Sequence, residues 1–308
     1  MRIAIAANAT HQTLCGKLLA EGFTRHGLTA EHHSSIRTAA TSDADLVIAW
    51  GWRNGLIARA EGKATLIMER AYLRDRFHWF SLGFGGLNGQ AWFPKPEDGG
   101  ARWREHFDGL LDDPRPEGSG EYAVILGQVP GDAALAGALN LRGFYDAAAR
   151  HIRKTLGLRV VIRPHPGDKA AGKVEHFGFP VIDGTLDEVL AKAAVAVAWN
   201  SNSLTDAALA GLPLLIGDRG AMTWPLGGDL RSGPGEPAAG PRLADRTAWS
   251  HRIAFAQWLP DEIASGLAWD HLRHAAPDAN PFQGTRFGYW REEADSVHSP
   301  VEQERAFG

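Results

Sequence analysis

Short apolar runs alternate with amphipathic segments of helical length along most of this chain, and this alternation constrains the fold more than any other feature. Examples of the apolar runs are Ile3–Ala7, Asp45–Trp50 and Val195–Trp199. A parallel strand that is buried on both faces has such a run, and the helices between successive strands cover those faces. The pattern therefore predicts an α/β protein with parallel sheets.

The alternation occurs in two series. The first predicts four strands before residue 70, and the second begins at Tyr122. Residues 70–100 between them are rich in aromatic residues and glycine without regular spacing, and residues 112–120 are a candidate linker. At 308 residues the chain has room for two domains of ordinary size. We predict two Rossmann-like domains facing a cleft, at 1–116 and 117–245, with helices and a tail at 246–308 that pack back on the first.

Composition excludes several classes of protein. There are 32 basic and 36 acidic residues, and the resulting net charge of −4 gives no general basic field for nucleic acid. The single cysteine, Cys15, excludes an intramolecular disulfide and a thiolate-based metal site, and it suits a reducing compartment. No apolar run reaches the roughly 18 residues that a membrane span needs. These features predict a soluble cytoplasmic protein.

The segment Arg163–Asp168, with the sequence Arg-Pro-His-Pro-Gly-Asp, follows a predicted strand of the second series. Ligands of open α/β sheets bind outside the carboxyl ends of the strands. The two prolines stiffen this loop, so Arg163 and His165 could be held in place toward a phosphate. The alternative interpretation is a rigid turn whose arginine pairs with a surface carboxylate.

A second polar loop, Trp199–Asp206, lies between a predicted strand and an alanine-rich helix. Its four small hydrogen-bonding residues exceed what one helix cap requires, and a helix N-terminus favours phosphate. Asp206 could cap the helix or accept hydrogen bonds from a ribose or sugar hydroxyl. The alternative is a capped helix with no ligand. The four small residues are Asn200, Ser201, Asn202 and Ser203.

The first series also offers candidates. The loop Glu69–Trp79 carries charged residues between aromatic ones, and it is either a surface for an acceptor or an Ω-loop packed by its own side chains. His11 follows the first strand and is either a general base or a solvated residue. Familiar phosphate-loop, dinucleotide and metal motifs fail on spacing, so we expect no metal. The charged candidates of the loop are Glu69, Arg70, Arg74, Asp75 and Arg76.

Taken together, the strand with Arg-Pro-His-Pro at Val160–Pro166, the Asn-Ser-Asn-Ser helix start and Ala210–Pro213 resemble the C-terminal domain of GT-B glycosyltransferases. Within that superfamily they are most similar to capsule-type Kdo transferases and CDP-glycerol glycerophosphotransferases. Residues 69–93 also resemble uncharacterised bacteriophage proteins, some of which are candidates for glycosylating hydroxymethylated pyrimidines in phage DNA. One departure is Asp206-Ala207, where capsule-type enzymes usually have Glu-Ala.

The resemblance implies an enzyme that moves a sugar from a nucleotide-sugar donor to a hydroxyl. The donor is UDP-, CDP- or GDP-linked, and the acceptor is a saccharide or a hydroxymethylated pyrimidine in DNA. His11 or Asp75 would be the base, in the cytoplasm (of the host, if a phage encodes the chain), with no tightly bound cofactor. An epimerase and a non-catalytic nucleotide- or phosphate-binding protein remain alternatives. The implied donor ligands are Arg163, His165, Asn200, Ser201, Asn202, Ser203 and Asp206, and the implied acceptor ligands are Glu69, Arg70, Arg74 and Arg76.

Overall fold

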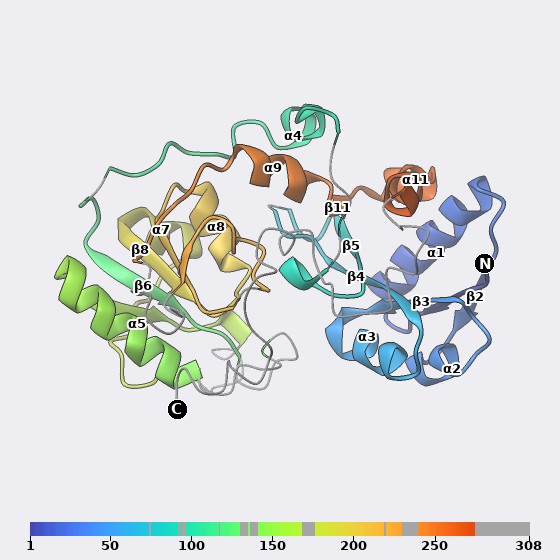
Figure 1. Cartoon of the computed structure of the whole chain (residues 1–308), viewed down its shortest axis with the longest axis horizontal. Coiled ribbons are helices and arrows are strands. Elements are labelled where there is room, and N and C mark those ends of the chain that lie inside the picture. Colours follow the sequence, from blue (N-terminus) through green and yellow to red (C-terminus); the bar gives the residue numbers. More distant parts are fainter. Residues whose placement is uncertain are drawn as a thin grey trace, which may run out of the picture. The chain divides into compact units, whose positions relative to one another are not determined.

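The chain forms two compact units in the computed structural model (Figure 1). Among the residues that the structure describes, unit 1 contains residues 1–106 and 250–274, and unit 2 contains residues 107–249. The described residues are 1–73, 75–91, 93, 97–116, 118–129, 135, 141–167, 176–218, 220–229 and 240–274.

Unit 1 is built on a six-stranded sheet with the order β11-β5-β4-β3-β1-β2. The first four strands of the chain are parallel, as predicted, although the edge strand β2 has the sequence Ala-Glu-His-His and is not an apolar run. β5 is antiparallel to β4, and β11 is antiparallel to β5. The strands are β1 (Ile3–Ala6), β2 (Ala30–His33), β3 (Leu46–Trp50), β4 (Ala64–Arg70), β5 (Phe80–Phe84) and β11 (Gln257–Trp258).

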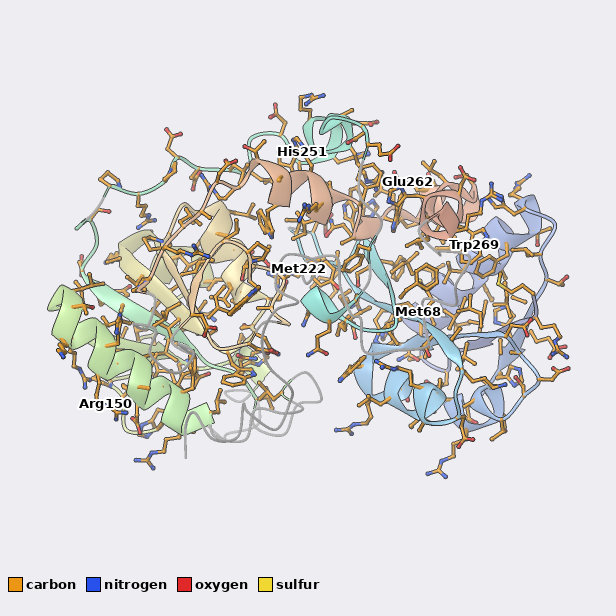
Figure 2. The ribbon with its side chains drawn as sticks, in the orientation of Figure 1. Met68, Arg150, Met222, His251, Glu262 and Trp269 are labelled. Atoms are coloured by element: carbon orange, nitrogen blue, oxygen red, sulfur yellow. The ribbon has the colours of Figure 1, made fainter. Side chains whose placement is uncertain are left out.

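Helices cover both faces of this sheet because its central strands bury side chains on each side. Cys15, Leu19 and Phe23 of α1 pack on one face, together with side chains from the C-terminal segment such as Trp269. Met68 of β4 and Trp269 of α11 both belong to this core (Figure 2). Small side chains from the next two helices pack on the other face. The helices of unit 1 are α1 (Thr10–Arg25), α2 (Ile36–Ala40), α3 (Gly51–Ala60), η1 (Asn88–Gln90), α4 (Ala101–His106), α10 (Pro260–Ala264) and α11 (Leu267–His274).

The aromatic segment between the two series contains a strand that its sequence did not reveal. β4 continues to Arg70, so Glu69 and Arg70 lie in a strand and not in a loop, which corrects the prediction. All five residues of β5 are buried, and they pair with β4 on one side and with β11 on the other. Ser81 and Gly83 interrupt the apolar residues of this strand, so its sequence forms neither a continuous apolar run nor an alternation of polar and apolar residues around a solvated face.

In the C-terminal segment, the sequence pattern predicts helices at Thr247–Trp258 and Asp261–Trp269, and the structure differs at both. The first, α9 (Thr247–Ala254), ends early because Gln257 and Trp258 pair with β5. The second is divided into α10 and α11 at Gly266, whose φ of +88° favours glycine. Both helices contribute side chains to the core of unit 1.

Unit 2 has a five-stranded, fully parallel sheet with the order β10-β9-β8-β6-β7. Phe144, Tyr145 and Ile152 of the long helix α5 pack against it. The apolar run Pro180–Ile182 predicts a further strand, but in the structure it forms only an isolated bridge between Val181 and Ile162. The elements are β6 (Tyr122–Leu126), α5 (Leu141–Leu156), β7 (Val160–Arg163), α7 (Leu186–Lys192), β8 (Ala193–Ala198), α8 (Ser203–Leu209), β9 (Leu214–Ile216) and β10 (Gly228–Asp229).

The first boundary between the units lies ten residues before the expected one, after His106 and not after residue 116. Residues 107–116 belong to unit 2 because their backbone forms hydrogen bonds with the end of α8 and the residues just after it. The N–H of Asp112 donates to the carbonyl of Leu209 over 2.9 Å, and the N–H of Arg115 donates to that of Gly211 over 2.9 Å. The chain returns to unit 1 at Ser250, a few residues after the expected boundary at 245/246.

Arg246 holds the end of α8 in the same region. Its guanidinium donates to the carbonyls of Ala208 and Leu209, and also to that of Asp112.

No helix among the described residues has both the length and the apolar character to span a membrane.

Candidate functional site

The carboxyl ends of the parallel strands meet at one edge of the unit 2 sheet. The polar loops that the sequence singled out follow β7 and β8, which both pair with β6. Arg163 is the last residue of β7, and Asn200 follows β8 by two residues. The structure therefore brings the Arg-Pro-His-Pro loop and the Asn-Ser-Asn-Ser loop to the same edge of one sheet, where open α/β sheets bind their ligands.

Arg163 lies half-buried at this edge. Burial lowers the pKa of its guanidinium, whereas the nearby negative charge of Asp206 raises it. Asp206 belongs to the first turn of α8, so this electrostatic interaction joins the two loops. The buried Nε of Arg163 has no hydrogen-bond partner among the described residues. Because a buried donor without a partner is costly, this guanidinium is suited to an anion that accepts several hydrogen bonds.

His165 lies two residues beyond Arg163 and is exposed. Its Nδ1 accepts a hydrogen bond from the N–H of Gly167 over 3.0 Å. A neutral imidazole in this arrangement carries its proton on Nε2, where it can be donated to a ligand. The last residue of the motif, Asp168, lies outside the described residues.

Gly127 allows the strand end of β6 to approach the Arg-Pro-His-Pro loop closely. Its N–H donates to the carbonyl of Arg163 over 2.9 Å. A Cβ at this position would lie 3.0 Å from that carbonyl oxygen and 3.3 Å from the backbone nitrogen of His165. Both neighbours are backbone atoms, so a side chain at position 127 would force the two strand ends apart by a few tenths of an ångström.

A helix N-terminus favours phosphate because its first N–H groups are free, and on this ground we expect free N–H groups at the start of α8; the structure differs. The N–H of Ser203 donates to Ser201 Oγ over 3.3 Å, and that of Leu204 donates to the Ser201 carbonyl over 3.0 Å. The N–H of Thr205 donates to the carbonyl of Asn202 over 2.9 Å. The expectation is therefore wrong for these three amides, because the turn satisfies them internally. The side chains of Ser201, Asn202 and Ser203, each half-buried, remain the candidate ligands.

Asn200 belongs to a hydrogen-bonded group of three side chains at the same edge. Its amide nitrogen donates to Asp218 Oδ2 over 2.8 Å, and its amide oxygen accepts from Gln128 Nε2 over 2.8 Å. Asn200 and Asp218 are buried, with 5% and 8% of their surface exposed. Sequence reasoning missed Gln128 and Asp218. Each lies two residues after a strand end, as Asn200 and His165 do, and this common offset is the signal that could have found them.

In unit 1, the carboxyl ends of β1, β3 and β4 likewise share one edge. His11, in the first turn of α1, packs edge-to-face against Trp50 at the end of β3, with 4.6 Å between ring centroids. Glu69 accepts a hydrogen bond from the N–H of Arg70 over 2.8 Å. The Arg70 guanidinium carbon lies 4.4 Å from the ring centroid of Phe77, which is 78% exposed.

The loop after β4 is held through hydrogen bonds that its backbone makes, two of them with the side chain of Gln257. The N–H groups of Tyr72 and Leu73 both donate to Gln257 Oε1 over 3.0 Å. Asp75 is exposed and has a φ of +58°, in a turn where its carbonyl accepts from the N–H of His78 over 2.9 Å. The half-buried Arg76 contributes its carbonyl to the N–H of Ala71, and Arg74 lies outside the described residues. The structure thus combines an anchored loop with the exposed side chain of Asp75.

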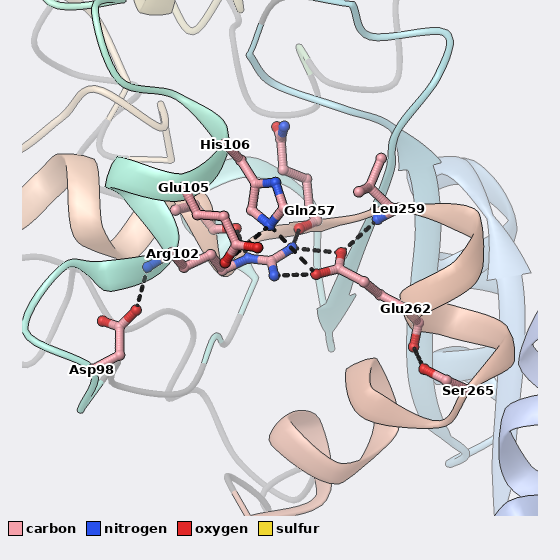
Figure 3. Close-up of polar contacts among 9 residues, drawn as sticks. Asp98, Arg102, Glu105, His106, Gln257, Leu259, Glu262 and Ser265 are labelled. Carbon is pink, nitrogen blue, oxygen red and sulfur yellow. Dashed lines mark hydrogen bonds and ion pairs between the residues drawn. The ribbon is translucent and has the colours of Figure 1, made fainter.

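A buried ion pair anchors the segment that contains Gln257, whose side chain holds this loop (Figure 3). Arg102 of α4, with 7% of its surface exposed, forms two hydrogen bonds with the carboxylate of Glu262. It also donates to the carbonyls of Ala254 over 2.8 Å and Gln257 over 3.0 Å. Its guanidinium carbon lies 4.4 Å from the ring centroid of Trp258. Nothing in the sequence marked this arginine, and its role is structural.

Among the described residues, no group of three or more His, Cys, Asp or Glu side chains is placed to hold a metal ion. No protein-family model matches the chain. No curated protein sequence matches it.

Two solved structures resemble the chain along nearly their whole length. The beta-Kdo 2,7-transferase of KpsC from Thermosulfurimonas dismutans is 15% identical, with a TM-score of 0.53, over 87% of this chain and 98% of its own. The beta-Kdo 2,4-transferase of KpsC from the same organism is 14% identical, with a TM-score of 0.50, over 88% of this chain and 97% of its own. A UDP-GlcNAc 2-epimerase of Methanocaldococcus jannaschii is 9% identical, over 81% of this chain and 98% of its own. Its TM-score of 0.31 is too low to indicate a shared fold. The chain has the fold of GT-B glycosyltransferases.

Proposed function

We propose that this chain, with the fold of GT-B glycosyltransferases, transfers a sugar from a nucleotide-sugar donor to a hydroxyl acceptor. Unit 2 holds the donor, linked to UDP, CDP or GDP. One observation carries the proposal: the half-buried Arg163, with an unsatisfied Nε, shares a sheet edge with the Asn-Ser-Asn-Ser loop. A guanidinium whose buried Nε lacks a hydrogen-bond partner at this edge supports a phosphate ligand.

The donor phosphates are the leaving group of the proposed reaction. As the bond between the anomeric carbon and the phosphate oxygen breaks, negative charge grows on the phosphate. Arg163 and the Nε2–H of His165 stabilise that charge, and the hydroxyls of Ser201 and Ser203 with the Asn202 amide add polar contacts. Asp206 accepts hydrogen bonds from a ribose or sugar hydroxyl. These roles are the same for inversion and for retention of the anomeric configuration.

Unit 1 holds the acceptor in this proposal. The acceptor hydroxyl must lose its proton as it attacks the sugar. An imidazole suits this task, and the packing of His11 against Trp50 fixes the ring. Asp75 is the second candidate for the base. Glu69, Arg70 and Arg76 contact the acceptor, together with Arg74 outside the described residues.

The proposed acceptor is a saccharide or a hydroxymethylated pyrimidine in DNA. Arginines on the loop after β4 support an acceptor with phosphate groups, since guanidinium pairs with phosphate. A DNA acceptor would also require the target base to leave the stack. The single Cys15 supports a reducing, cytoplasmic location for the reaction.

The proposal is tested by incubating the chain with UDP-, CDP- and GDP-linked sugars, with and without an acceptor. The acceptors are an oligosaccharide set and a duplex containing 5-hydroxymethylcytosine. We expect acceptor-dependent release of the nucleotide and a mass increase of one sugar on one acceptor. Isomerised sugar without an acceptor would instead identify an epimerase. Tight nucleotide binding without any turnover would identify a non-catalytic binding protein.

A further inference from the structure

Gln128 connects two strand ends of unit 2 through both atoms of its side-chain amide. Its Nε2 donates to Asn200 Oδ1 over 2.8 Å, and its Oε1 accepts from the backbone N–H of Asn200 over 3.1 Å. Gln128 follows β6 and Asn200 follows β8, which are neighbours in the sheet. One carboxamide therefore fixes both the backbone and the side chain of Asn200.

Asp218 extends this connection to a third strand end. It follows β9, and its Oδ2 accepts from Asn200 Nδ2 over 2.8 Å. Its Oδ1 accepts from the N–H of Gly220 over 2.9 Å, and its own N–H donates to the carbonyl of Trp199 over 2.9 Å. The carboxylate is thus engaged on both oxygens, by the loop after its own strand and by the loop after β8.

These contacts give Asn200 a role different from that of a direct ligand. Its side-chain oxygen, side-chain nitrogen and backbone N–H are all engaged within the protein. A buried amide with its groups satisfied holds its position rigidly. Asn200 immediately precedes Ser201, so its position sets where the polar loop begins.

The residue before Gln128 fixes the other loop. The N–H of Gly127 donates to the carbonyl of Arg163 over 2.9 Å, and the absence of a Cβ permits this approach. Two consecutive residues after β6 therefore hold the Arg-Pro-His-Pro loop on one side and the Asn-Ser-Asn-Ser loop on the other. Their separation is the distance that a phosphate between the loops would have to span.

We infer that Gln128, Asn200 and Asp218 are positioning residues for the donor phosphate, and that they set the spacing between Arg163 and the Ser201–Ser203 loop. The inference rests on the proposed function. It replaces the expected role of Asn200 as a donor ligand. Neither Gln128 nor Asp218 touches the nucleotide in this account, because each acts through Asn200.

A reversed hydrogen-bond pair tests the inference. Both carboxylate oxygens of Asp218 accept hydrogen bonds, so in Asp218→Asn the new NH₂ group must face another donor, either the Asn200 amide nitrogen or the N–H of Gly220. This mismatch displaces Asn200 and should raise the Kd for the bound nucleotide about tenfold. Asn200→Asp combined with Asp218→Asn reverses donor and acceptor, since the new carboxylate at position 200 would accept from Gln128 Nε2 and from the new amide at position 218. This double variant keeps the net charge and should recover a Kd within about threefold of the original. Asp187→Asn, an exposed position of α7, is the matched control.

The ligands for this test are UDP, CDP and GDP, and each variant is also followed by thermal unfolding. Gln128→Ala should raise the Kd and the KM for the donor about tenfold while kcat at saturating donor stays within about twofold. A double variant that folds but binds as weakly as Asp218→Asn alone would mean that the carboxylate at 218 acts on the ligand itself, against the inference.

The binding measurements separate a failure of the proposed function from a failure of the positioning roles. If the unmodified chain binds none of the nucleotides, the proposed function fails and the inference fails with it. If the unmodified chain binds a nucleotide and Gln128→Ala binds it equally well, the inference alone is wrong.

Discussion

Replacing Arg102 by methionine removes the positive half of a buried ion pair, and we expect a loss of about 3–5 kcal/mol in the stability of unit 1. The carboxylate of Glu262 is 13% exposed and would keep the N–H of Leu259 as its hydrogen-bond donor. Two backbone carbonyls, of Ala254 and Gln257, would lose their donors as well. Methionine retains much of the apolar contact with the surrounding aromatic rings, so the loss reports mainly on the charge.

Thermal and urea unfolding of the full chain measure this loss. At about 2–4 °C per kcal/mol for a unit of this size, the Tm should fall by roughly 10 °C. Arg104→Met on the same helix is the control, since Arg104 is exposed and should change stability by less than about 0.5 kcal/mol. Arg102→Met with Glu262→Gln should recover part of the loss, because no buried charge remains. A Tm for Arg102→Met equal to that of Arg104→Met would refute this reasoning.

Three further predictions concern other parts of the chain. Gly127→Ala forces backbone atoms apart, so it should weaken nucleotide binding and lower the Tm, whereas Gly240→Ala should change neither; equal effects would contradict the close approach. Hydrogen bonds from the backbone and hydroxyl of Thr185 lower the pKa of Glu188, so its stabilising effect is complete above the unfolded pKa and is lost as the pH falls through the lower folded value. Thr185→Ala should therefore raise the pKa of Glu188 in an NMR titration, and an unchanged pKa would count against the cap. His11→Ala should reduce kcat by about 10²- to 10⁴-fold and leave the nucleotide Kd unchanged, so a parallel loss of binding would argue against a role as base.

The central parallel strands of each sheet were predictable because they are buried on both faces and so appear as apolar runs. β5 was not, since glycine and serine interrupt its apolar side chains and its second partner, β11, lies far away in the sequence. The early end of α9 has the same origin. Helical spacing of the late aromatic residues predicted one helix, but pairing of Gln257 and Trp258 with β5 outweighed that local pattern.

The candidate site was predictable as far as chain order determines it. Two polar loops that follow parallel strands of one sheet must share its carboxyl edge, and Arg163 and Asn200 do. The partners of Asn200 could not be predicted, because a single glutamine or aspartate after a strand is unremarkable until the sheet order places it beside another. The internal hydrogen bonds at the start of α8 also depend on local backbone geometry that the residue types leave open.

The phosphate site of unit 2 is tested by calorimetric titration of the purified chain with UDP, CDP, GDP and the monophosphate CMP. We expect at least one nucleotide to bind, and Arg163→Ala to weaken its binding by about 1.5–3 kcal/mol, or roughly 10- to 150-fold. Arg159→Ala, an exposed arginine of the same unit, should bind like the unmodified chain. Equal affinities for Arg163→Ala and Arg159→Ala would contradict a phosphate site at the carboxyl edge of the unit 2 sheet.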